Sequence, residues 1–86
     1  MTTTTIKRMA REIGTEYDRI STWPAKRYDS DVDTFDTLLG LFPDVIRALV
    51  TVRGDAFTSD RECAAAARVI IRTIRAEHAA QLKELL

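Results

Sequence analysis

The stretch that decides the fold runs from Ser59 to Leu86 and reads SDRECAAAARVIIRTIRAEHAAQLKELL. Ser59 and Glu62 have the spacing of a helix capping box, in which the serine hydroxyl accepts a hydrogen bond from the backbone N–H of the glutamate. Neither Gly nor Pro follows, so we expect one uninterrupted helix. At its usual rise per residue this helix is about 40 Å long, which exceeds what a small domain needs. We therefore expect part of it to project from the domain or to be covered by a second copy.

The predicted last helix has one apolar side. At 100° per residue, its apolar positions share one arc, which we expect to pack on the core. The members of this arc are Cys63, Ala67, Ile70, Ile71, Ile74, His78, Leu82 and Leu85. Beside the arc runs a side of small residues that lets another helix approach closely, either within the chain or across a homodimer seam. These small residues are Ala65, Ala66, Val69, Ala76 and Ala80.

The opposite side of the same helix is basic, and it carries no acidic residue. Its members are Arg61, Arg68, Arg72, Arg75 and Lys83. One interpretation is a solvated face that keeps the protein soluble, because most charged helix faces have that role. The other is a surface that docks on an acidic partner or a phosphate backbone. Both interpretations predict exposed side chains, so that charge reversal of Arg68, Arg72 and Arg75 leaves folding nearly intact.

The rest of the chain predicts three shorter helices. Apolar residues recur at helical spacing from Ile6 to Ile20, after threonines that can cap a helix, and this helix should end near Ser21, before Pro24. A second helix should begin near Ser30 or Asp31, where aspartates suit the positive end of the helix dipole, and run to about Leu41.

The segment PDVIRALVTVR, residues 43–53, predicts a third helix that Gly54 stops in a left-handed conformation. Its β-branched residues make a strand the alternative, but a lone strand would have no partner in this chain. The sequence thus predicts an all-α fold: a small four-helix domain with a long C-terminal amphipathic helix, in which residues 1–86 form a single domain.

Composition narrows the functional classes. Thirteen basic and thirteen acidic residues give a formal net charge of zero, which argues against nucleic-acid binding through bulk charge. A single cysteine, Cys63, rules out an intramolecular disulfide. The N-terminus lacks the pattern of a secretory signal, and the longest apolar region, residues 38–57, is interrupted by charges and Pro43. We therefore expect a cytoplasmic protein with no membrane segment.

The sequence offers little for catalysis or metal binding. An EF-hand loop that begins at Asp29 would need Gly and Glu where Thr34 and Gly40 stand. His78 and Cys63 lie about 22 Å apart along one helix, so they cannot share a metal ion or a proton within one chain. We expect His78 at the edge of the core, Cys63 buried, and a protein that is not an enzyme and binds no cofactor or metal.

Two further segments have the composition of binding surfaces. Trp23, Arg27 and Tyr28 combine aromatic and basic side chains, as binding hot spots do, although Trp23 can equally act as a lid on a small core. Residues 38–52 carry more apolar surface than one side of a helix pair can hide. Within this segment we expect five residues to form the core or a dimer interface: Leu38, Leu41, Phe42, Ile46 and Val50.

Two functional hypotheses follow from these features. The first is a non-enzymatic regulator or inhibitor module that docks on another protein as a homodimer. Its contact surface would be residues 38–52, which we call the apolar hairpin, the segment around Trp23, or the basic face of the last helix. The second is a small DNA-binding transcriptional regulator or antitoxin-type protein that sets the basic face of the last helix against phosphates. The second is disfavoured because no helix pair with a glycine turn precedes a polar recognition helix.

Overall fold

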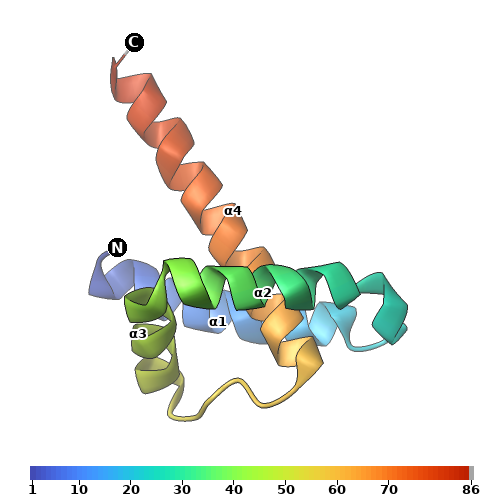
Figure 1. Cartoon of the computed structure of the whole chain (residues 1–86). Coiled ribbons are helices and arrows are strands. Elements are labelled where there is room, and N and C mark those ends of the chain that lie inside the picture. The colour runs from blue at the N-terminus through green and yellow to red at the C-terminus, as the bar shows by residue number, and fades with distance from the viewer. Residues whose placement is uncertain (86) are drawn as a thin grey trace.

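The computed structural model describes residues 1–85, most of which lie in four α-helices and one short 3-10 helix (Figure 1). The α-helices are α1 (Thr3–Ile20), α2 (Asp29–Leu41), α3 (Pro43–Arg53) and α4 (Asp60–Leu85), and η1 (Ala25–Arg27) connects α1 to α2. The described residues contain no strand. The all-α prediction is therefore confirmed, and α3 is a helix as expected.

The helix ends follow local signals in the sequence. The Thr2 hydroxyl accepts a hydrogen bond from the backbone N–H of Thr5 and caps α1. Pro43 occupies the first turn of α3, and Gly54 ends that helix in the left-handed region at φ 85°. The Ser59 hydroxyl accepts the backbone N–H of Glu62, as a capping box requires. The second helix begins at Asp29, slightly earlier than predicted.

The first half of α4 lies between α1 and α2, which make the two largest helix contacts of the molecule with it (Figure 1). Four consecutive alanines, Ala64 to Ala67, are fully buried at this crossing. Because alanine side chains are so short, α1 and α2 both approach the backbone of α4 closely. The third helix packs mainly on α1.

The buried side of α4 differs in part from the predicted apolar arc. Ala65, Ala66 and Val69, from the side of small residues, are fully buried together with Ile70. Ile71 and Ile74 only partly bury their side chains against the core. The small residues thus pack within the chain up to Val69, so this stretch offers no surface for a homodimer seam.

The second half of α4 extends away from the body (Figure 1). From Ala76 to Leu85 every residue except Glu77 is exposed, including Leu82 at 47% and Leu85 at 83%. The prediction that His78, Leu82 and Leu85 pack on the core was therefore wrong. The physical reason is length, because α1 and α2 do not reach this part of α4. We call residues 76–85 the free end of α4.

The predicted apolar hairpin divides between core and surface. Leu38 and Ile46 are buried, and Val50 is half-buried. Leu41, at the end of α2, is 66% exposed, and Phe42 is 38% exposed. Within residues 1–85, none of the helices has the length and apolar character that crossing a membrane requires.

Candidate functional site

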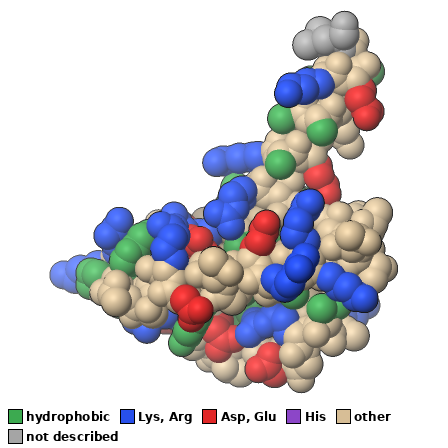
Figure 2. Space-filling view, turned by 180° about the vertical axis from the view of Figure 1, so that it is seen from behind, with side chains coloured by type: hydrophobic (Ala, Val, Ile, Leu, Met, Phe, Trp, Pro, Cys, Tyr) green, Lys and Arg blue, Asp and Glu red, His purple; other side chains and the backbone are tan. Residues whose placement is uncertain are grey.

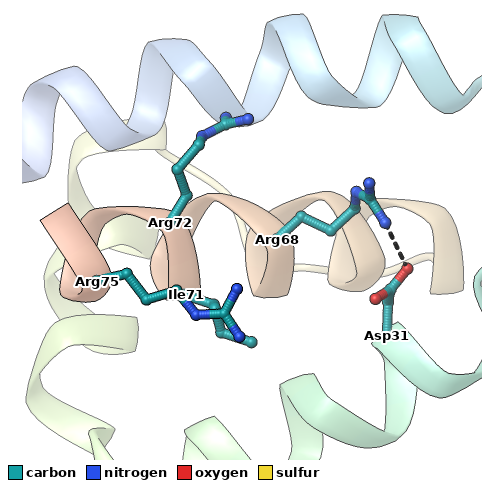
Figure 3. Close-up of a pocket in the computed structure, with 5 residues that line it drawn as sticks. All are labelled: Asp31, Arg68, Ile71, Arg72 and Arg75. Atoms are coloured by element: carbon teal, nitrogen blue, oxygen red, sulfur yellow. Dashed lines mark hydrogen bonds and ion pairs between the residues drawn. The ribbon is translucent and has the colours of Figure 1, made fainter.

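A cavity of about 420 Å³ opens on the outer side of α4, beside α2. Its lining is mostly arginine: Arg68, Arg72 and Arg75, with Ile71 and Asp31. Figure 3 shows Arg72 pointing toward α1 and Arg68 pointing toward Asp31 on α2. We call this cavity the arginine groove. It collects three of the five basic residues that the sequence placed on one face of α4.

Arg68 ties three helices together at one end of the groove. Its Nε donates a 2.7 Å hydrogen bond to Oε1 of Glu16 on α1, and its Nη1 donates a 3.1 Å hydrogen bond to Oδ2 of Asp31 on α2. These two carboxylates raise the pKa of Arg68. The side chain is only 33% exposed. Of the two interpretations of the basic face, free solvation does not apply to this arginine, because acidic residues from other helices face it.

Glu16 is the centre of the ion-pair network. It is 4% exposed and accepts hydrogen bonds from Arg19 and Arg68, and Arg72 approaches to 3.8 Å. The hydrogen bonds from Arg19 and Arg68, with the positive charges of both groups, outweigh the cost of burial and lower the pKa of Glu16 to about 2. One carboxylate therefore serves three guanidinium groups.

Trp23 joins this network through cation–π contacts. The guanidinium of Arg27 lies 3.7 Å from the centre of its ring, and those of Arg19 and Arg68 lie at 5.0 and 5.1 Å. The ring is half-buried and packs against the core, as a lid would. Trp23 and Arg27 thus lie next to the groove rather than forming a separate surface.

The site holds more positive than negative charge. Among the described residues, five arginines surround the site, and the carboxylates that pair with them are those of Glu16 and Asp31. Arg75 is exposed and has no carboxylate within ion-pair distance in the part of the chain that the structure describes. Figure 2 shows Lys and Arg side chains gathered on this side of the molecule, at the base of the free end. Such a surplus favours an anionic ligand, since guanidinium groups bind carboxylate or phosphate oxygens strongly.

The remaining predicted binding residues lie outside the groove. Tyr28 is only 6% exposed and belongs to the core, so a partner could reach no more than the edge of it. Arg61 is half-buried, with its guanidinium 5.8 Å from the centre of the Tyr28 ring. Lys83 is exposed on the free end of α4. Two further residues, Glu16 and Arg19, determine the electrostatics of the site and were not predicted from the sequence.

The described residues bring no cluster of potential metal ligands together. Across residues 1–85, no three His, Cys, Asp or Glu side chains come close enough to hold a metal ion. Burial, together with Asp60, Asp36 and Glu62, raises the pKa of the half-buried Cys63 thiol, so the reactive thiolate is disfavoured. His78, expected at the edge of the core, is exposed on the free end of α4.

No protein-family model matches this chain, and neither a curated protein nor a solved structure shows detectable similarity to it.

Proposed function

We propose that this chain is a cytoplasmic, non-enzymatic protein-binding module that acts as a regulator or inhibitor. It binds an acidic segment of another protein in the arginine groove. The observation that carries the proposal is the shortage of carboxylates around the groove. Glu16 is shared by Arg19, Arg68 and Arg72, and Arg75 lies near them without an ion pair to any described residue. An incoming carboxylate supplies the missing charge and forms bidentate hydrogen bonds with a guanidinium.

The charges around the groove suit an acidic side chain better than a nucleic-acid backbone. Asp31 lines the groove, and α2, which carries it, has no basic residue. A duplex presents a long row of phosphates, and α2 offers no basic side chain to contact the phosphates that lie beyond the arginines. A side-chain carboxylate enters the groove alone. DNA binding is therefore the second candidate function, and it is favoured by the basic groove because guanidinium groups also bind phosphate oxygens.

The proposal is tested by fluorescence anisotropy with two labelled probes, an oligoglutamate peptide and a random-sequence DNA duplex. The groove variant is the double substitution Arg72→Gln and Arg75→Gln, at two exposed positions where little stability is at stake. We expect the peptide to bind the unaltered protein at least about tenfold more tightly than the groove variant, because charge-assisted hydrogen bonds are lost.

The matched control is the double substitution Lys7→Gln and Arg11→Gln. These residues line a different cavity, between α1 and α3, and their removal changes the net charge by the same amount. The proposal fails if the control weakens peptide binding as much as the groove variant does, since net charge would then explain both effects. Tighter binding of the duplex, lost in the groove variant, would establish the DNA-binding alternative instead.

A further inference from the structure

The free end of α4 and the arginine groove form one continuous surface. Ile71 lines the groove, and His78, Leu82 and Leu85 follow it at spacings of seven, four and three residues, which keeps them on one side of the helix. Leu82 and Leu85 expose large apolar side chains, and no part of the described chain covers them. A line of apolar residues at this spacing is the surface against which a second helix packs.

We infer that the segment captured by the arginine groove is the carboxyl end of an amphipathic α-helix of another protein, which lies antiparallel along the free end of α4. This inference rests on the proposed function and specifies its partner. The apolar face of that helix covers Leu82 and Leu85, and its acidic end reaches Arg72 and Arg75.

The antiparallel direction follows from electrostatics. The last carbonyl groups of a helix are unpaired and form the negative end of its dipole. In the antiparallel arrangement these carbonyls, and any acidic side chains near them, face Arg72 and Arg75. In the parallel arrangement the positive end of the dipole would face the same arginines. The arginine groove therefore selects the carboxyl end of the incoming helix.

A second copy of this chain fits the surface poorly. In a two-fold antiparallel pair, like sides of the two helices face each other. If the carboxyl end of one α4 reached the groove of the other copy, Lys83 would come level with Arg72, and both residues lie on the same basic side. These two positive charges would repel each other, whereas acidic residues near the carboxyl end of a foreign helix would attract the arginines of the groove.

Binding should also order the free end of α4. Nine of its ten residues are exposed, and isolated helices of that length are marginal in water. The backbone amides of this segment should therefore exchange with solvent quickly in the free protein. Packing of a partner helix should slow their exchange.

The test uses two synthetic helical peptides of four to five turns with identical composition, each with leucines along one face. One carries its glutamates in the last turn and the other in the first turn. We expect the peptide with the acidic carboxyl end to bind about tenfold more tightly, and to protect the amides of the free end of α4 from hydrogen exchange. Equal affinity of the two peptides, or unchanged exchange at the free end, would overturn the inference.

A pair of variants separates this inference from the proposed function. The double substitution Leu82→Ala and Leu85→Ala introduces a residue that also favours helix. It should weaken binding of the helical peptide about tenfold, while oligoglutamate binding stays unchanged. The control is Glu84→Ala, on the far side of the helix. If oligoglutamate binding depends on Arg72 and Arg75 but the leucine variant binds the helical peptide normally, the inference is wrong and the proposed function stands. If oligoglutamate binding does not depend on those arginines, both are wrong.

Discussion

Glu16 Oε1 accepts a 2.7 Å hydrogen bond from Nε of Arg68, fifty-two residues later in the chain. The pair joins the first helix to the last, and Asp31 extends it to α2 through the same arginine. A charged group that is 4% exposed persists in a small core only when its charge and hydrogen bonds are satisfied. Two of the arginines that pair with Glu16, Arg68 and Arg72, also line the groove, so these two side chains contribute both to folding and to the candidate binding site.

Replacement of Glu16 by Gln should destabilise the protein. Arg19, Arg68 and Arg72 would lose their shared counter-charge, and Arg68 is too buried for water to replace it fully. We expect a loss of about 1–3 kcal/mol in the free energy of unfolding, measured by urea denaturation. Asp44→Asn is the control, because Asp44 is 93% exposed in its pair with Arg47. Equal effects of the two substitutions would show that the network contributes no stability.

The stability contributed by Glu16 should depend on pH. Its pKa is about 2 in the folded protein, against an ordinary value of 4.5, so the unfolded chain takes up the proton at higher pH than the folded chain does. The stabilisation is therefore complete above about pH 4.5 and is lost as the pH falls toward about 2. The difference in unfolding free energy between the unaltered protein and Glu16→Gln should shrink over that interval. A difference that stays constant with pH would contradict this assignment.

Two glycines should respond to alanine in opposite directions. Gly54 ends α3 at φ 85°, where a Cβ is strained even though nothing lies within 4 Å of it, so Gly54→Ala should cost about 1 kcal/mol. Gly14 lies in the middle of α1 with open space around it, so Gly14→Ala should stabilise by about 0.5–1 kcal/mol. Thermal unfolding of both variants measures the two effects. A stabilising Gly54→Ala would mean that α3 ends differently in solution.

Self-association remains a prediction, and the exposed residues at the α2–α3 turn indicate where to test it. Leu41 is 66% exposed and Phe42 is 38% exposed, and a chain of this size gains stability by covering such surface. Sedimentation equilibrium at micromolar concentration should give a mass above the 9.7 kDa of one chain. The double substitution Leu41→Gln and Phe42→Gln should restore the monomer, whereas Leu82→Gln should not. A monomer at high concentration for the unaltered protein would end the dimer hypothesis.

Local signals were sufficient to predict the helices from the sequence. The cap at Ser59, the stop at Gly54 and the first-turn position of Pro43 each depend on neighbouring residues, and each was predicted. The packed side of α4 was only partly predicted, because that side depends on where α1 and α2 cross it. Four buried alanines mark the crossing, and hydrophobicity alone ranks alanine too low to identify it.

The ion-pair network could not be found from α4 alone. Its carboxylates come from α1 and α2, so the basic face appeared free of acidic neighbours. One signal was present in α1. Its buried residues recur at alternating spacings of three and four, and Glu16 occupies the fourth of these five positions. An acidic residue at an apolar-spaced position predicts a cation on the helix that packs there, and α4 supplies Arg68.

Trp23 gives the chain an optical reporter of its own. It is the only tryptophan, and Arg68, one of the three guanidinium groups around its ring, also lines the groove. Any ligand that draws Arg68 toward itself changes the charge close to the indole. The emission wavelength and intensity of that single fluorophore should therefore follow occupancy of the groove without a label.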